Sequence, residues 1–341
     1  MPNNPTKILL STTLIGGILV SISANSWLGA WMGLEINLMS FIPLMLSQEN
    51  IYTTEASLKY FLVQALASST LLFLVVMKAL VCQMLPAANS DYTTYMIMTP
   101  LLMKMGAAPM HWWFPGVMEG LSWTNCLLMM TVQKVAPMML TSYLMESKFL
   151  ALMVILMSVI VGAMGGMNQL SLRKILTYSS INHTGWMLSA MLLGDNLWLM
   201  YFLVYSMLTS TVVLVVKAYN ISFVNQVMMV NNKTAMKLML FSTLLSLGGL
   251  PPFIGFLPKW MVIQGLVMSN MGLMVTAMVV MSLATLYYYL RVCYTSFMMV
   301  HEEMKWNVKT HVYNETIMHG TILSSMSMLT LIMCAAIINI H

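Results

Sequence analysis

The chain has 341 residues, of which 59% are hydrophobic and 7% are charged, and its mean hydropathy is +0.81. A soluble fold cannot expose so apolar a chain to water, so the composition excludes a soluble globular protein and predicts an integral membrane protein. The formal net charge of +5 is spread over loops and forms no basic run of the kind that follows a phosphate backbone, which argues against nucleic-acid binding.

Apolar stretches long enough to cross a bilayer recur along the whole chain. A spanning helix needs about 20 apolar residues, and these runs are too long and too uniform to be strands of a barrel. Because the bilayer core offers no water to bare backbone groups, we predict an all-α fold in a single polytopic domain. The eleven expected spans are residues 7–23, 26–46, 56–85, 92–106, 121–143, 149–167, 172–193, 197–219, 234–268, 272–299 and 317–340.

The sequence carries no signature of a metal or redox centre. Its four cysteines lie far apart in or beside apolar segments, and are expected to be small buried hydrophobic residues. There is no glycine-rich dinucleotide motif, no P-loop, no cysteine set for an iron–sulfur cluster and no histidine pair for haem. We therefore expect no cofactor and no metal bound by this chain, and lipid as its usual ligand.

Two predicted spans contain a helix-breaking sequence. Gly106 and Pro109 interrupt the fourth span, and the ninth is interrupted by Gly248, Gly249, Pro251 and Pro252. Broken helices at corresponding positions of two halves indicate an inverted-repeat transporter. Because the breaks are five spans apart, we predict two antiparallel five-helix repeats, residues 7–143 and 149–299, followed by a C-terminal helix at 317–340. The alternative is a pair of unrelated kinks.

The cationic loops predict the orientation in the membrane. Seven of these residues fall on the side that also holds the N-terminus, whereas the opposite loops keep little beyond Lys148. By the positive-inside rule, the N-terminus is expected on the matrix or cytoplasmic side. The seven are Arg173, Lys174, Lys217, Lys233, Lys237, Lys305 and Lys309.

Four charged residues lie where a helix would bury them in the membrane. Glu35 is near the middle of the second span, Lys104 directly precedes the first break, Lys134 precedes Pro137, which we expect to kink the fifth span, and Lys259 follows the second break. An Asp, Lys or Arg at a helix centre costs about 2.5–3.5 kcal/mol to insert, so such residues normally face a partner or a cavity. The set is either a pair of static salt bridges or a path for protons.

The chemistry of a buried lysine favours the proton path. Desolvation makes a lysine easier to deprotonate, and a carboxylate at about 4 Å returns roughly 4 kcal/mol at an effective dielectric of about 20. We hypothesise that Glu35 pairs with Lys104, and that loosening this pair sends a proton towards Lys134 and then Lys259.

Two histidines are further candidates, and three other charged residues are assigned to the surface and left out of the candidate set. His183, among hydroxyl-bearing neighbours, is a further relay candidate, and His111 beside the first break is a weaker one. The alternative for each is the ordinary interpretation of a hydrogen-bonded interior histidine. Glu55 and Lys59 have the spacing of a surface pair, and Lys78 is expected to reach the membrane surface.

Four stretches of the chain resemble one family closely. They are residues 26–37 (SWLGAWMGLEIN), 102–115 (LMKMGAAPMHWWFP), 179–183 (SSINH) and 246–260 (SLGGLPPFIGFLPKW). They are similar to the mitochondrially encoded NADH dehydrogenase subunit 2 family of respiratory complex I, and the likeness runs over nearly the whole chain. It implies an antiporter-like fold in which Glu35, Lys104, Lys134 and Lys259 match the family's glutamate and lysines.

The resemblance also implies a function, a location and partners. It implies a proton-translocating subunit of the mitochondrial inner membrane, driven at a distance by quinone reduction in a complex that uses NADH, FMN, iron–sulfur clusters and ubiquinone. The implied partners are subunits 4, 4L and 6, accessory subunits and phospholipid. The chain begins without the three further N-terminal helices of bacterial relatives, as animal versions do.

One departure and two rival interpretations stay open. The second half has no acid equivalent to Glu35, its seventh span offering only His183, so strict equivalence of two proton paths is doubtful. A stand-alone cation/proton antiporter would share the broken helices and buried lysines but would be expected to carry a carboxylate-rich site. A purely structural subunit would need the lysines for assembly and not for pumping.

Overall fold

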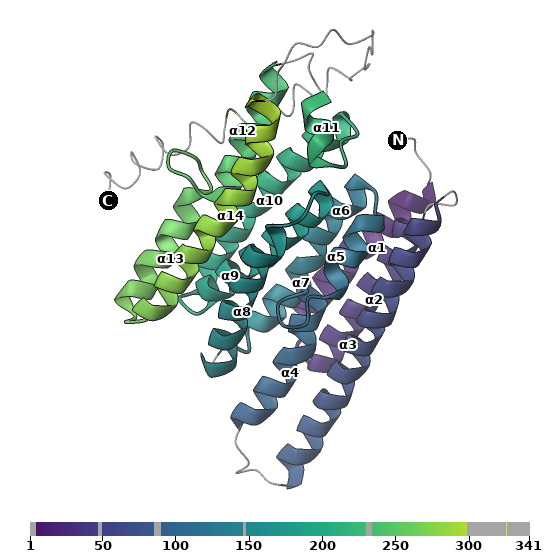
Figure 1. The fold of residues 1–341 in the computed structure, drawn as a ribbon. Helices are drawn as coiled ribbons and strands as arrows, with labels where there is room; N and C mark the ends of the chain where they lie inside the picture. Colours follow the sequence, from purple (N-terminus) through teal and green to yellow (C-terminus); the bar gives the residue numbers. More distant parts are fainter. Residues whose placement is uncertain are drawn as a thin grey trace. The chain divides into compact units, whose positions relative to one another are not determined.

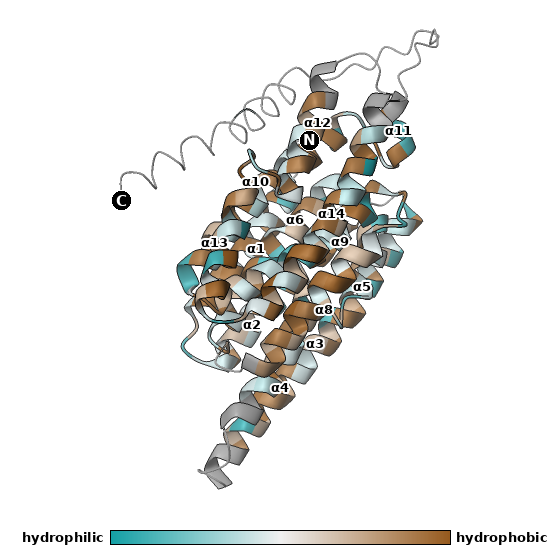
Figure 2. Cartoon of the chain, turned by 60° about the vertical axis from the view of Figure 1, so that its left-hand side comes forward, coloured by the Kyte–Doolittle hydropathy of each residue, from teal (hydrophilic) through white to brown (hydrophobic). Residues whose placement is uncertain are grey.

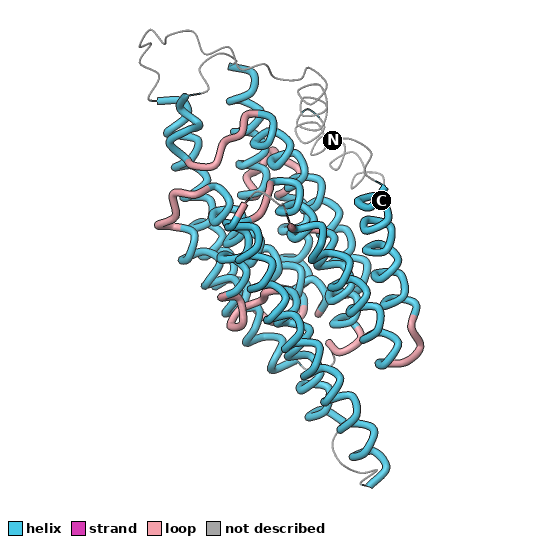
Figure 3. Tube along the Cα trace, turned by 90° about the vertical axis from the view of Figure 1, so that its right-hand side faces the viewer, coloured by secondary structure: helices cyan, strands magenta, loops and turns pink. Residues whose placement is uncertain are grey.

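The computed structural model describes residues 5–46, 50–84, 90–145, 148–229, 234–298 and residue 325, and these residues form helices joined by short connections (Figures 1 and 3). Strand pairing in this part of the chain is limited to an isolated antiparallel bridge between Ser171 and Phe223. The helices are α1 (Pro5–Ser23), α2 (Trp27–Met45), α3 (Ile51–Met84), α4 (Ser90–Met105), α5 (Trp113–Gly120), α6 (Trp123–Met130), α7 (Val132–Ser142), α8 (Lys148–Gly166), α9 (Leu172–Met191), α10 (Asp195–Ala218), α11 (Val224–Met229), α12 (Thr234–Gly248), α13 (Phe256–Met268) and α14 (Gly272–Met298).

The prediction of an all-helical membrane protein is confirmed for the described residues. The first ten expected spans coincide with helices, and the eleventh, residues 317–340, lies outside the described residues except for Ser325. Within the part of the chain that the structure describes, six helices, α1, α2, α3, α8, α10 and α14, are both long and apolar enough to cross a membrane. Their outward faces are largely apolar (Figure 2), with exposed side chains such as Leu62 on α3 and Leu283 on α14.

The fifth expected span is interrupted at a residue that was not predicted from the sequence. Pro137, which we expected to kink the span, lies inside α7, and the helix is interrupted upstream at Thr131, between α6 and α7. The Thr131 hydroxyl donates to the Leu127 carbonyl at 2.7 Å, and the Lys134 amide bonds the Thr131 carbonyl in a tighter turn. Proline disturbs the backbone bonds of the turn before it, so a break upstream of Pro137 has a local cause.

The described chain divides into two compact units, Met1–Val154 and Ile155–His341. In the first unit α1 packs along α2, and α3 packs against α2, α4 and α5, while α7 contacts α1, α2 and α4. In the second unit α10 packs on α9, α12 and α13, and α14 packs on α9, α11, α12 and α13. In α9 every residue from Ser179 to Met191 is buried within the protein. The hydroxyl, amide and imidazole groups of this helix are therefore surrounded by protein and not by lipid.

A backbone-to-backbone contact between two helices at a glycine in the first unit has a counterpart in the second unit. A Cβ on Gly17 of α1 would stand 2.9 Å from the Asn37 nitrogen of α2, and one on Gly162 of α8 would stand 2.5 Å from the Asn182 nitrogen of α9. The residue types and their separation along the sequence are the same in the two pairs. Only glycine lets two backbones approach so closely, and small-residue contacts of this kind join helices within membranes.

At one end of the second unit the connections between helices are tied together. The bridge residues join the turn before α9 to the turn before α11, with Leu172 donating to the Ser222 carbonyl at 3.0 Å. From α14, the Arg291 guanidinium donates to the carbonyls of Met167 and Gln169 at 2.5 and 2.6 Å. These bonds hold the α8–α9 connection, which leads into the cationic start of α9.

Candidate functional site

A small cavity in the first unit has two of the predicted lysines in its wall. Lys104 and Lys134 are 7% and 2% exposed, and both line a space of about 20 Å³ between α2, α3, α4, α5, α6 and α7. A space of this size is sufficient for a water molecule when polar groups line it, and amide side chains line this one as well. The two lysines, 30 positions apart in the sequence, therefore share one polar chamber.

Lys104 stands in the last turn of α4, directly before the first break. Its backbone carbonyl accepts a hydrogen bond from Gln64 of α3 at 3.3 Å. The Glu35 carboxylate on α2 lies near enough for its charge to act on the Lys104 ammonium, but the two do not meet in an ion pair within 4.0 Å. Glu35 is half-buried and does not line the cavity. The structure therefore shows no direct salt bridge between Glu35 and Lys104.

Lys134 lies in the first turn of α7, between the interruption at Thr131 and Pro137. Its ammonium nitrogen stands over the ring of Phe114 from α5, 5.1 Å from the ring centroid. An aromatic face attracts a cation most strongly where water is excluded, so this ring is a suitable neighbour for a buried ammonium group.

A chain of amide and phenol groups beside the lysines was not predicted from the sequence. The Gln133 side chain of α7 donates to the Asn37 side-chain oxygen of α2 at 3.0 Å and accepts from the Tyr60 hydroxyl of α3 at 3.4 Å. All three residues line the same cavity as Lys104 and Lys134. Polar residues in apolar spans were the available signal, since Asn37 follows Glu35 closely and Gln133 directly precedes Lys134.

The two predicted helix breaks have the same backbone geometry. Gly106 and Gly249 both have positive φ, 71° and 79°, and each follows the last turn of its helix. In both, the glycine amide bonds the carbonyl three residues earlier and the next amide bonds the carbonyl five residues earlier, which is the Schellman arrangement. The third residue after each glycine is a proline joined by a cis peptide bond.

Lys259 reaches back across the second break from the first turn of α13. Its side chain is 4% exposed, and its ammonium nitrogen donates to the Gly248 carbonyl at 2.9 Å and to the Leu247 carbonyl at 3.5 Å. The same nitrogen stands 5.6 Å from the ring centroid of Trp186 on α9. The partners that the structure shows for this lysine are therefore helix-end carbonyls and an indole face.

His183 of α9 is buried among tyrosines in the second unit. Its Nδ1 lies 2.9 Å from the Tyr201 hydroxyl, and its ring stacks near that of Tyr205 at 5.0 Å. These three residues line a smaller cavity of about 10 Å³ together with Pro258, the neighbour of Lys259. His111 lies in the first break, where its Nδ1 is 3.1 Å from the Pro109 carbonyl.

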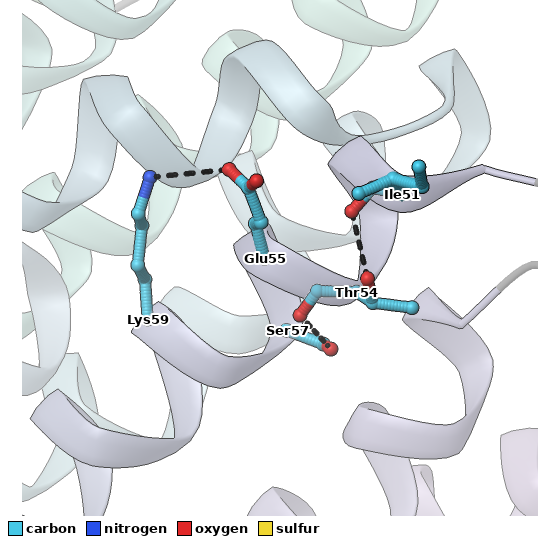
Figure 4. A network of polar contacts seen from close by, with 5 residues as sticks. All are labelled: Ile51, Thr54, Glu55, Ser57 and Lys59. Atoms are coloured by element: carbon cyan, nitrogen blue, oxygen red, sulfur yellow. Dashed lines mark hydrogen bonds and ion pairs between the residues drawn. The ribbon is translucent and has the colours of Figure 1, made fainter.

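Of the three charged residues that we assigned to the surface, Glu55 and Lys59 are exposed and Lys78 is half-buried. Lys59 and Glu55 form an ion pair at 3.9 Å with side chains 61% and 57% exposed, beside hydroxyl-to-carbonyl bonds of Thr54 and Ser57 (Figure 4). Among the described residues no group of three or more His, Cys, Asp or Glu side chains is placed to hold a metal ion.

Comparison with known proteins identifies the family. The model of the NADH:quinone oxidoreductase/Mrp antiporter transmembrane family matches residues 24–285, and that of the NADH dehydrogenase subunit 2 C-terminus matches residues 286–338. NADH-ubiquinone oxidoreductase chain 2 of Anopheles gambiae is 49% identical over 304 residues, covering 89% of each chain. The protein of the same name from Locusta migratoria is 44% identical over 333 residues, covering 97% of each chain. That from Dasypus novemcinctus is 38% identical over 313 residues, covering 89% of this chain and 90% of the relative.

Solved structures share the fold at lower sequence identity. A chain of respiratory complex I from Thermus thermophilus superposes with a TM-score of 0.83 at 23% identity, covering 97% of this chain and 79% of its own length. A chain of the Mrp complex from Dietzia sp. DQ12-45-1b gives 0.81 at 15% identity, covering 96% and 75%. The chain thus belongs to the NADH-ubiquinone oxidoreductase chain 2 family, the antiporter-like membrane subunits of mitochondrial respiratory complex I.

Proposed function

We propose that this chain translocates protons across the mitochondrial inner membrane along buried lysines, coupled to NADH:ubiquinone electron transfer elsewhere in the complex. The observation that carries the proposal is the shared polar cavity of Lys104 and Lys134. Two titratable groups in one water-sized space, with the Glu35 charge close to one of them, form the minimum set for passing a proton.

The relay begins with the charge of Glu35. When the carboxylate is close to Lys104, the ammonium form is favoured, and moving or neutralising the carboxylate releases a proton into the cavity. A water molecule there passes it to Lys134. Lys259 and His183 continue the path in the second unit, and His111 contributes at the first break. The chain itself carries out no redox chemistry and binds no cofactor.

We also propose that residues 7–143 and 149–299 are inverted five-helix repeats, with 317–340 as an additional helix. Two correspondences support this proposal. The glycine-to-asparagine contact recurs in α1–α2 and α8–α9, and the Schellman-type end recurs at Gly106 and Gly249. Similar local structures in the same order within each half are expected from duplication.

The orientation and the partners are part of the proposal. Arg173 and Lys174 at the start of α9 and Lys217 at the end of α10 lie near the same tied end of the second unit, and by the positive-inside rule this end faces the matrix. The N-terminus then faces the matrix as well. The partners are other membrane-arm subunits, among them subunits 4, 4L and 6, with accessory subunits and phospholipid.

The decisive experiment compares lysine substitutions in complex I reconstituted into vesicles. We expect Lys134→Gln and Lys104→Gln to lower the number of protons moved per electron, with Lys59→Gln as the control for an exposed lysine. Normal proton-to-electron ratios in assembled Lys104 and Lys134 variants would show that the relay is wrong. Poor assembly combined with a normal ratio would support a structural subunit, and migration of the wild-type chain on its own in native gels would support an independent antiporter.

A further inference from the structure

The end of α12 at the second break has each of its last four carbonyls bonded. The Leu245 carbonyl accepts from the amides of Gly249 and Leu250, and the Ser246 carbonyl accepts from Gly249. The remaining two, of Leu247 and Gly248, accept from the Lys259 ammonium. A helix normally ends with four carbonyls unbonded, and in an apolar interior each would be costly, so this lysine completes the helix end.

A cation suits this position because a helix C-terminus carries a partial negative charge. The glycine at the break provides the space for it. A Cβ on Gly249 would stand 2.9 Å from Cδ and 3.0 Å from Nζ of Lys259, so any other residue there would displace the ammonium group. The α12 terminus therefore takes the place of a carboxylate as the counter-charge of Lys259.

The first break is closed by neutral donors instead. From the first turn of α5, the Trp113 indole N–H donates to the Met103 carbonyl in the last turn of α4 at 3.1 Å. The Lys104 carbonyl of the same turn accepts from the Gln64 amide. In each unit, then, a side chain of the resumed helix bonds back to the helix before the break. The two donors differ in chemistry, because the indole N–H of Trp113 keeps its proton at any physiological pH, whereas the ammonium group of Lys259 can lose one.

We propose that Lys259 is the positioning residue that closes the α12–α13 break, and that this closing contact requires the lysine to be protonated. Trp113 is the corresponding residue in the first unit, and its contact does not depend on protonation. The dependence on the proton rests on the proposed function, because it takes Lys259 to change its protonation state during turnover. Losing the charge would weaken the bonds to Leu247 and Gly248 and loosen the break. The helices packed against α13 carry other titratable groups, of which six are buried: His183, Tyr201, Tyr205, Tyr288, Tyr289 and Cys293. The half-buried or exposed ones on these helices are Arg173, Lys174, Tyr178, Asp195, Lys217, Tyr287, Arg291 and Tyr294.

Hydrogen–deuterium exchange in the assembled complex tests the contact. The reporters are the amides of Gly249 and Leu250 at the second break and those of Gly106 and Ala107 at the first. We expect Lys259→Met, which removes the donor and the charge, to speed exchange of the first two by at least about fivefold and leave the other two unchanged. Trp113→Phe should give the reverse pattern. Unchanged exchange at Gly249 and Leu250 in Lys259→Met would overturn the proposal.

The protons moved per electron, measured on the same preparation, separate this inference from the proposed relay. Faster exchange with a normal ratio keeps Lys259 as the closing residue and overturns its proton dependence, whereas unchanged exchange with a lowered ratio overturns the closing contact and keeps the relay. If Lys259→Met does not assemble, Gly249→Ala displaces the ammonium group, and Gly106→Ala is its matched control. The two glycines both have a positive φ, so alanine strains the backbone at either position. They differ in what the added Cβ would meet, which is Lys259 at Gly249 and two Phe114 carbons, at 3.3 Å, at Gly106. Equal loosening of the two breaks would contradict the proposal.

Discussion

Replacing Gln133 by leucine should destabilise the first unit, because Gln133 is the central member of the buried chain Asn37–Gln133–Tyr60. The substitution removes the donor to Asn37 at 3.0 Å and the acceptor of Tyr60 at 3.4 Å. Asn37 and Tyr60 are each 3% exposed. A buried polar group that loses its partner costs about 1–3 kcal/mol. The Tyr60–Gln133 bond, at 3.4 Å, contributes less to stability than the shorter one, and a water molecule can enter the cavity of about 20 Å³ and bond to one of the groups left without a partner. We therefore expect the free energy of unfolding to fall by about 2 kcal/mol.

The assay is the temperature at which the solubilised complex loses half of its NADH:ubiquinone activity. Gln133→Leu should lower this midpoint, whereas Gln264→Leu, at an exposed position of α13, should leave it unchanged. The double variant Asn37→Leu/Gln133→Leu should recover part of the loss, because removing both partners leaves no orphaned amide between them. The reasoning is refuted if Gln133→Leu matches Gln264→Leu, or if the losses of the two single variants simply add.

Three further outcomes follow from named contacts. Gly33→Ala should prevent assembly of the complex on native gels, because its Cβ would stand 2.5 Å from the Ser21 nitrogen, whereas Gly16→Ala, with nothing within 4 Å, should assemble normally; assembly of both would contradict this. Arg291→Gln should speed tryptic cleavage after Lys174 in the solubilised complex, because the α8–α9 connection loses two charge-assisted bonds worth about 1.5–3 kcal/mol each; an unchanged cleavage rate would argue against the role of Arg291. Glu55→Gln should change stability by less than about 0.5 kcal/mol, because its ion pair is exposed; a clear fall in the inactivation midpoint would contradict that.

The helices and breaks were predictable because the bilayer imposes a length on every span and because glycine and proline mark the interruptions. The burial of Lys104, Lys134 and Lys259 followed from the same reasoning, since a charge in the middle of a span has to be enclosed by protein. These features depend on local sequence, so they could be inferred residue by residue.

The partners of the buried groups could not be predicted in this way. Gln133 and Asn37 are 96 positions apart and meet only because α7 packs on α2. The bond from Lys259 to Gly248 depends on the turn that the chain takes after α12, and nothing in the side-chain types indicates it. The interruption at Thr131 was not predicted, because the residue that marks this span as irregular, Pro137, lies six positions further along the chain.

The glycine contacts between α1 and α2 and between α8 and α9 have a mechanical consequence. Where two backbones touch at Gly17 and Asn37, neither a lipid chain nor a side chain can enter between the helices, and sliding would force Gly33 into the Ser21 backbone. We therefore expect the two helices of each pair to move together as one rigid body. Bending is then expected where the backbone hydrogen bonds of a helix are interrupted, at Gly106, Thr131 and Gly249. Gly106 and Thr131 each lie within a few residues of a lysine in the sequence, and Gly249 lies against the Lys259 side chain.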